Sequence, residues 1–266
     1  MEHLKELTEQ VCRLARETGA YLKAERRNFR PEVAEEKHEH DYVSYVDREA
    51  ERRIVGALHE LLPEAGFVTE EGTAGLKGEE LRWVVDPLDG TTNFLHNHAP
   101  YCVSIALCRR RERLMGVVYD PCREECFYAW KGGGAWMEGE RIGVTATQGL
   151  EGALMVVELP YDAERYRPTA LHLLERLYGR VAGVRMMGSA ALALCYVAAG
   201  RLDAWLEAYI GPWDMAAGAL MVEEAGGRVT DFLGREAETG CHHIVATNGG
   251  LHQELLQVVA EQLPRL

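Results

Sequence analysis

Two aspartates, Asp86 and Asp89, stand three residues apart directly after the apolar run that begins at Trp83. Pro87 separates them and Gly90 follows, so the spacing predicts that a buried strand ends here and that both carboxylates converge on one tight loop. Two carboxylates about 4 Å apart repel each other by about 4 kcal/mol at an effective dielectric of roughly 20. They therefore need a cation or a shared proton. Because all the ligands are oxygen, the pattern favours a hard ion, Mg²⁺ first and Mn²⁺ second.

The residues after these acids could bind an anion. Gly90, Thr91 and Thr92 are small, and they offer backbone N–H groups where a helix could start. Carboxylates beside such a loop indicate a metal–phosphate site. The alternative interpretation is that Asp89 and Gly90 form an ordinary turn and that Asp86 caps the strand.

Three further acids have the same two interpretations. Glu70 follows the short β-rich run 67–69 and is adjacent to Glu71, and adjacent glutamates are usually just a solvated pair. Asp214 falls at the predicted N-terminus of a helix, and Asp47 at that of another, where an aspartate commonly caps the helix. None of these acids predicts a site by itself.

Together these segments resemble one family. The stretches DPLDGTTNF at 86–94 and WDMAAG at 213–218 are similar to the two signature motifs of the inositol monophosphatases. DYVSYVD at 41–47 and TEE at 69–71 precede them in the order and at the separation that the family shows. The resemblance extends from about residue 4 to residue 262.

The resemblance implies a lithium-sensitive, Mg²⁺-dependent phosphomonoesterase, commonly a homodimer, with a layered αβαβα sugar-phosphatase fold of the α/β (α+β) class. Two metal ions could ionise a water on one side of the phosphate and stabilise the leaving alkoxide on the other. They would also neutralise a phosphate that a protein of net charge −13 repels. The implied ligands are Glu70, Asp86 and the backbone carbonyl of Leu88 for one ion, and Asp86, Asp89 and Asp214 for the second.

The same resemblance assigns roles around the substrate. Asp47 and the Thr91 hydroxyl would orient and activate the attacking water, and Glu70 is the third implied catalytic residue. Gly90 and Thr91 would cradle the phosphate through their N–H groups. The residues that would contact the rest of the substrate are Ser189, Ala190 and Glu207, the last of them as an acceptor for ring hydroxyls.

Inositol-1-phosphate, hydrolysed to inositol and phosphate, is the substrate that the resemblance favours. Thr92 and Asn93 stand where 3′-nucleotide bisphosphatases of the superfamily tend to carry Lys-Glu. The alternatives are fructose-1,6-bisphosphatase, 3′-nucleotide bisphosphatase or histidinol-phosphate phosphatase activity, or a catalytically weak regulatory homologue. Lys37 lies where relatives often carry a lysine near a third metal position. The resemblance is loose over this loop, so we assign Lys37 no role.

The elements that must position these residues follow from hydrophobic periodicity. An amphipathic helix is predicted over 4–22, a mobile polar loop over 31–41 and a second helix from near Asp47 to before Pro63. Short β-rich runs between 83 and 130 predict an antiparallel sheet. After 146 the rhythm indicates βαβ units, with strands near 153–157, 181–187, 203–208 and 243–246 and helices over 164–178, 189–200, 214–225 and 250–262.

These patterns predict two domains. Residues 1–145 would form an α+β domain with the antiparallel sheet and the main metal loop, and residues 146–266 an α/β domain. With 47% hydrophobic and 27% charged residues, the composition excludes a disordered or collagen-like chain.

Charge and hydrophobicity also argue against some classes of binding partner. The net charge of −13 argues against nucleic-acid binding. The longest uncharged apolar run, 186–200, is shorter than the roughly 20 residues that span a bilayer, and no leader segment is visible. We therefore expect a cytoplasmic protein with thiol cysteines that acts on a small-molecule phosphomonoester, with neither nucleic acid nor membrane as a partner.

Overall fold

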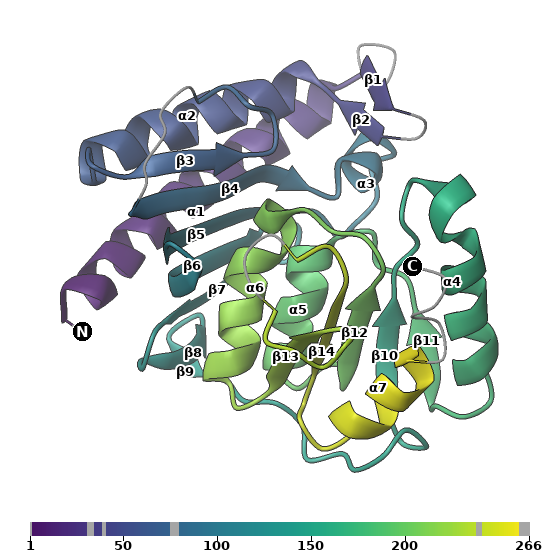
Figure 1. Cartoon of the computed structure of the whole chain (residues 1–266). Coiled ribbons are helices and arrows are strands. Elements are labelled where there is room, and N and C mark those ends of the chain that lie inside the picture. The colour runs from purple at the N-terminus through teal and green to yellow at the C-terminus, as the bar shows by residue number, and fades with distance from the viewer. Residues whose placement is uncertain (1, 31–34, 39–40, 75–79, 238–240, 261–266) are drawn as a thin grey trace.

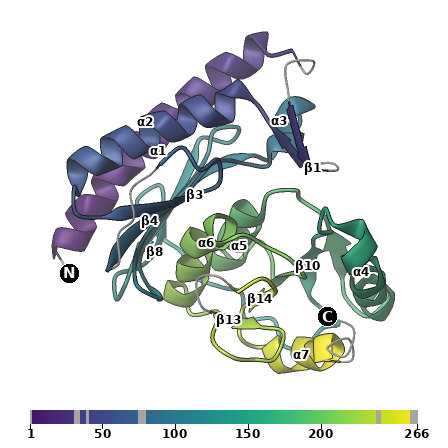
Figure 2. The same cartoon turned by 45° about the horizontal axis from the view of Figure 1, so that its top comes forward.

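Five layers of helices and sheets build the molecule (Figures 1 and 2). The computed structural model describes residues 2–30, 35–38, 41–74, 80–237 and 241–260. One pair of helices covers the outer face of a seven-stranded sheet, a second pair lies between that sheet and a five-stranded sheet, and a third pair covers the far face. This order confirms the predicted αβαβα fold. The pairs are α1 (Glu2–Asn28) with α2 (Tyr45–Leu61), α5 (Ala190–Ala198) with α6 (Pro212–Glu224), and α4 (Ala163–Leu177) with α7 (His252–Ala260).

The seven-stranded sheet follows the order of the chain. Its neighbours are antiparallel except for the first two strands, which are parallel. The predicted antiparallel sheet is thus confirmed. Its strands are β3 (Gly66–Thr69), β4 (Leu81–Asp89), β5 (Cys102–Arg109), β6 (Glu112–Asp120), β7 (Glu125–Trp130), β8 (Gly134–Met137) and β9 (Glu140–Arg141).

The five-stranded sheet is mixed. In its order β11-β10-β12-β14-β13, the first three strands are parallel and joined through helices, as predicted, whereas β14 pairs antiparallel with both β12 and β13. The prediction of βαβ units is therefore wrong for the last part of the chain, and β13 was missed. The strands are β10 (Leu154–Val157), β11 (Gly183–Arg185), β12 (Ala204–Glu207), β13 (Arg228–Asp231) and β14 (Ile244–Thr247).

Near the N-terminus two predictions need correction. The helix predicted over 4–22 extends over Glu2–Asn28. The loop predicted over 31–41 contains strand β1 (Glu35–His38), which pairs antiparallel with β2 (Asp41–Val43), because backbone hydrogen bonds can hold a strand such as β1 that has no apolar residue of its own. Residues 31–34 and 39–40, and the side chain of Lys37, lie outside the described part of the structure.

The middle layer holds the two halves of the chain together. The side chains of α5 are apolar on every side and buried, as expected for a helix enclosed between two sheets. Helix α6 lies directly on the large sheet: a Cβ on Gly116 of β6 would stand 2.8 Å from the Cα of Ala217. The chain passes from the large sheet to the small one between Arg141 and Leu154, which includes the predicted domain boundary, and one core spans both sheets. Whether the halves are separate folding units stays a prediction.

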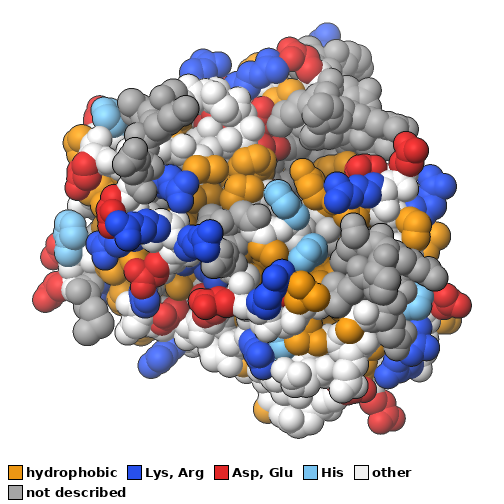
Figure 3. All heavy atoms as spheres, viewed as in Figure 1, with side chains coloured by type: hydrophobic (Ala, Val, Ile, Leu, Met, Phe, Trp, Pro, Cys, Tyr) orange, Lys and Arg blue, Asp and Glu red, His pale blue; other side chains and the backbone are white. Residues whose placement is uncertain are grey.

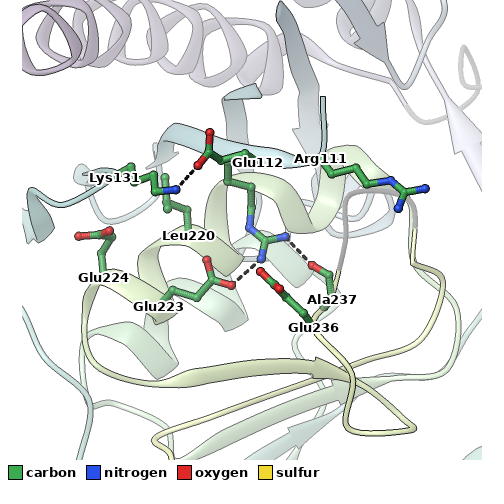
Figure 4. Close-up of a pocket in the computed structure, with 9 residues that line it drawn as sticks. Arg111, Glu112, Lys131, Leu220, Glu223, Glu224, Glu236 and Ala237 are labelled. Carbon is green, nitrogen blue, oxygen red and sulfur yellow. Dashed lines mark hydrogen bonds and ion pairs between the residues drawn. The ribbon is translucent and has the colours of Figure 1, made fainter. Parts of the chain in front are cut away.

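A cavity of about 440 Å³ lies where β6, α6 and the segment after β13 meet (Figure 4). The buried guanidinium of Arg113 contacts the Glu223 carboxylate at 2.5 Å and donates to the carbonyl of Ala237 at 2.7 Å. Arg113 of β6 thus binds α6 and the segment after β13 at once, and so ties both sheets to α6. Other charged groups in the wall of the cavity are paired too, Lys131 with Glu112, and Glu224 with the N–H groups of Gly132 and Gly134.

The surface carries both signs of charge. On the face shown in Figure 3, Lys and Arg side chains are interspersed with Asp and Glu, so the net charge of −13 does not gather there into one acidic patch. None of the helices in the described ranges is both long enough and apolar enough to cross a membrane. All seven cysteines are free thiols, as predicted.

A buried histidine makes stability depend on pH. His252 is fully buried at the start of α7, with its ring nitrogens 3.0 Å from the Thr230 hydroxyl and 2.9 Å from that of Thr247. Burial, with Arg228 nearby, lowers its pKa to about 4. Between pH 6.5 and about 4 the unfolded chain therefore binds a proton that the folded chain does not, so protons favour unfolding there.

We expect this histidine to cost about 3 kcal/mol of the free energy of unfolding as the pH falls from 7 to 4. His252→Gln keeps a hydrogen-bond donor and an acceptor but does not titrate. Over the same pH range its free energy of unfolding should therefore fall by about 3 kcal/mol less than that of the wild type. Urea unfolding of both proteins at several pH values measures the difference. An equal loss in the two proteins would contradict the assignment.

Candidate active site

A bulge in β4 brings Asp86 and Asp89 to one side of the large sheet. Asp86 pairs with Ser104 and Asp89 with Cys102, so β4 has one residue more than β5 over this interval. In a regular strand, residues three apart face opposite sides, and the extra residue restores a common side. The strand ends at Asp89, as predicted for this pair of acids, but it includes Pro87. The strand continues because a bulge tolerates a residue without an N–H.

The third aspartate comes from the middle layer. Asp214 lies in the first turn of α6, and its Oδ2 accepts from the N–H of Gly211 at 2.8 Å. Gly211, and not Asp214, is the N-cap residue. Ligand oxygens of Asp86, Asp89 and Asp214 all lie within 4.8 Å of one another. Residues more than a hundred positions apart thus share one small volume.

Burial and mutual repulsion raise the pKa of these acids. The pKa of Asp86 is well above its usual range because the side chain is buried and faces Glu70, Asp214 and Asp89. The pKa of Asp214 is well above its usual range for the same reasons, burial first and then Asp89 and Glu70. A buried, oxygen-only, mutually repelling set of ligands fits a hard divalent cation, whose charge would reverse the repulsion.

Asp89 is anchored at the start of α5. Its Oδ2 accepts from the Ser189 hydroxyl at 2.6 Å and from the N–H of Ala191 at 2.9 Å. These bonds lower the pKa of Asp89, but burial outweighs them and the net direction is upward. Ser189, predicted to bind substrate, thus directs its hydroxyl at a predicted metal ligand.

Thr91 joins the loop to a buried carboxylate. Its hydroxyl lies 3.1 Å from Oδ1 of Asp47 and 3.0 Å from the carbonyl of Leu88, so one proton faces two acceptors. Asp47 is not the N-cap that the sequence suggested: it stands in the first turn of α2 and accepts from Ser44, the true N-cap, through the hydroxyl at 2.6 Å and the N–H at 2.9 Å. Burial raises its pKa.

Gly90 fits where a side chain would not. Its φ is +95°, and a Cβ would stand 3.0 Å from the carbonyl oxygens of both Gly188 and Pro100. The short helix α3 (Thr91–Leu95) begins directly after it. The N–H groups of a first helical turn have no partner within the helix, as an anion-binding loop requires.

These groups line a cleft of about 430 Å³ between the two sheets. Asp47 is not part of the cleft wall: it lies behind Thr91 and is 1% exposed. Glu207, the last residue of β12, borders the cleft, and burial with Glu158 and Asp214 nearby raises its pKa well above the usual range. The structure thus brings the predicted residues together, while their roles stay predictions. Those that line the cleft are Glu70, Asp86, Leu88, Asp89, Gly90, Thr91, Ser189, Ala190, Glu207 and Asp214.

Several residues of the wall were missed. Glu158 directly follows β10, as Glu207 ends the neighbouring β12, so its place after an apolar run was a usable signal. Tyr209 stacks on His242 with ring centroids 5.4 Å apart, and Tyr161 also lines the cleft. These three residues are far apart in the sequence, and no motif indicates that their rings share one wall.

Known proteins share this chain's sequence and fold. The model of the inositol monophosphatase family matches residues 3–264. A Pseudomonas aeruginosa protein named Nus factor SuhB is 44% identical over 235 residues, 86% of each chain. A Thermotoga maritima protein named fructose-1,6-bisphosphatase/inositol-1-monophosphatase is 40% identical over 221 residues, 83% of each chain.

Solved structures agree with this relationship. Extragenic suppressor protein suhB from Bartonella henselae superposes with a TM-score of 0.90 at 37% identity, over 96% of this chain and 98% of that one. An IMPase from Thermotoga maritima superposes with a TM-score of 0.87 at 36% identity, over 99% of each chain. The match over nearly the whole length confirms the resemblance read from the two motifs: the chain belongs to the inositol monophosphatase family.

Proposed function

We propose that this member of a phosphatase family hydrolyses phosphomonoesters with Mg²⁺ as cofactor, and that inositol-1-phosphate is its preferred substrate. The observation that carries the proposal is the convergence of Asp86, Asp89 and Asp214, whose ligand oxygens lie within 4.8 Å of one another in the wall of a cleft. Lithium inhibition and a homodimer are further expectations from the family.

The chain supplies the parts of a metal-assisted hydrolysis. Glu70, Asp86, Asp89 and Asp214, with the carbonyl of Leu88, would hold the divalent ions; all of them border the cleft. Bound there, the cations would neutralise the phosphate and favour ionisation of a water. The N–H groups after Gly90 would orient the phosphate oxygens.

Thr91 and Asp47 would position the attacking water. The Thr91 hydroxyl borders the cleft and has Asp47 Oδ1 behind it at 3.1 Å. With Thr91 Oγ1 donating to Asp47, its lone pairs can accept a hydrogen bond from a water in the cleft. Ser44 donates to the other oxygen of the Asp47 carboxylate, and so fixes the acceptor that faces the Thr91 hydroxyl.

The part of the cleft beside Glu207 suits an uncharged polyol better than a second phosphate. Among the described residues that line it, none is Lys or Arg, and Glu207 would repel an anion. A carboxylate is, however, a strong acceptor for hydroxyl groups. This favours inositol-1-phosphate over bisphosphates, although one relative's name includes fructose-1,6-bisphosphatase, which makes that activity the second candidate.

A third candidate comes from the relatives named Nus factor SuhB. A chain with that role could act as a catalytically weak regulatory homologue. The presence of every predicted metal ligand in the cleft favours an active enzyme.

A kinetic panel tests the proposed function. We expect phosphate release from inositol-1-phosphate with Mg²⁺, loss of activity with a chelator, and inhibition by lithium. Fructose-1,6-bisphosphate, 3′-phosphoadenosine-5′-phosphate, histidinol phosphate and glycerol-2-phosphate at the same Mg²⁺ concentration complete the panel. Faster turnover of a bisphosphate would replace the substrate assignment. A folded protein with no turnover on any member would favour the regulatory homologue.

Asp89→Asn should abolish turnover and leave the fold intact. We expect kcat to fall by about a hundredfold or more, because the variant removes charge from the ion site. The amide oxygen can still accept from Ser189 and Ala191, and one buried charge less relieves repulsion, so Tm without metal should stay equal or rise. Mg²⁺ should raise the Tm of the wild type but not of the variant. Near-normal turnover would count against the metal assignment.

Glu207→Gln should separate ring recognition from chemistry. We expect KM for inositol-1-phosphate to rise about tenfold, since a charged hydrogen-bond acceptor is lost. The KM for 4-nitrophenyl phosphate should change much less, because its ring carries no free hydroxyl group for Glu207 to bind. Parallel initial-rate measurements on the two substrates decide this, and equal losses on both would mean that Glu207 does not contact the ring.

A further inference from the structure

The turn before α5 forms part of the cleft wall and contacts residues 90–92, the phosphate loop, whose N–H groups would bind the phosphate. Met187 and Gly188 make this turn, with Gly188 at φ +66°. The carbonyl of Gly188 lies against Gly90, where a Cβ would stand only 3.0 Å from it. The position of these two residues therefore determines how much room the cleft leaves beside the phosphate loop.

Glu158 binds this turn from the side of the small sheet. The N–H groups of Met187 and Gly188 both donate to its Oε1, at 2.7 Å and 3.0 Å. Glu158 directly follows β10, and its own N–H donates to Leu206 of β12 at 3.2 Å, so its backbone is fixed by the sheet. One oxygen atom on a rigid element thus satisfies two successive N–H groups of an exposed turn.

Asn93 binds the same turn from the side of the phosphate loop. Its Nδ2 donates to the carbonyls of Met187 at 2.9 Å and of Pro100 at 2.7 Å. Because carbonyl oxygens are acceptors only, the group that faces them must be the NH₂ of the amide. A carboxylate at this position could not make either bond.

We propose that Glu158 and Asn93 are positioning residues that clamp Met187 and Gly188 from opposite sides, and so fix the wall against which the leaving group of the substrate lies. The clamp itself is independent of the reaction, while its effect on catalysis rests on the proposed function. It requires an acceptor at 158 and a donor at 93, and no negative charge at either position.

These requirements predict opposite effects for two near-isosteric changes. Glu158→Gln keeps an acceptor oxygen and removes a charge whose burial already raises the pKa of the acid, so the clamp should survive. Asn93→Asp keeps the shape and replaces the donor by a carboxylate that repels two carbonyls, so the clamp should fail. Glu158→Ala removes the acceptor, and Glu175→Ala, an exposed acid on α4, is the matched control.

Amide hydrogen exchange tests the clamp without any substrate. In the peptide that contains Met187 and Gly188, we expect exchange about tenfold faster in Glu158→Ala than in the wild type, with Glu158→Gln and Glu175→Ala within about threefold of it. Unchanged exchange in Glu158→Ala, or exchange in Glu158→Gln as fast as in Glu158→Ala, would overturn the proposal.

Kinetics then test the effect on the cleft. In Glu158→Ala and Asn93→Asp, KM for inositol-1-phosphate should rise about tenfold while kcat changes by less than about threefold, because α5 keeps its own packing and still holds Asp89. Glu158→Gln should restore the wild-type KM. Altered exchange with an unchanged KM would reject the role in the cleft. If the wild type turns over no phosphomonoester, the proposed function fails, and the exchange rates alone decide the clamp.

Discussion

The mutual repulsion of buried carboxylates is the constraint on which this structure depends. Asp86, Asp89 and Asp214 crowd their oxygens within 4.8 Å of one another, and Glu70 adds to the field that raises the pKa values of Asp86 and Asp214. No local preference of the chain would produce this arrangement. It persists because the surrounding elements are packed too tightly to let the acids separate, and a divalent cation would turn the same repulsion into binding free energy.

The middle layer supplies most of that rigidity. Asp214 stands in the first turn of α6, and Asp89 lies at the start of α5, where the N–H of Ala191 binds it. Both helix N-termini therefore direct partial positive charge toward the acids. The helices can do this because their apolar surfaces pack directly against both sheets. At Gly116 the contact is so close that an added Cβ would stand 2.8 Å from the Cα of Ala217. The buried core and the ion site are thus one structure.

The sequence allowed the residue types of the site, and most of the layers, to be predicted. No single acid predicted the site, but the two motifs together resemble those of one family, and periodicity separates helices from strands. Three features could not be read in this way. The bulge at Pro87 depends on pairing with β5, and the antiparallel direction of β14 depends on contacts that are distant in the chain. The N-caps Ser44 and Gly211 each stand three residues before an aspartate, which is itself a common N-cap residue. Each depends on tertiary contacts, which periodicity does not report.

The acid cluster and the rest of the cleft wall come from different segments of the chain. Relatives and structural neighbours with different names share this chain's sequence or fold, so neither the family nor the fold alone specifies the substrate. Under the proposed function, the candidate substrates differ in their leaving group. It would face the wall formed by the ends of β10 and β12, the turn at Met187 and Gly188, and the stacked rings of Tyr209 and His242. Side chains in this wall could be exchanged without moving Asp86, Asp89 or Asp214, which stand on β4 and α6. Substrate choice can therefore change while the ion site remains intact.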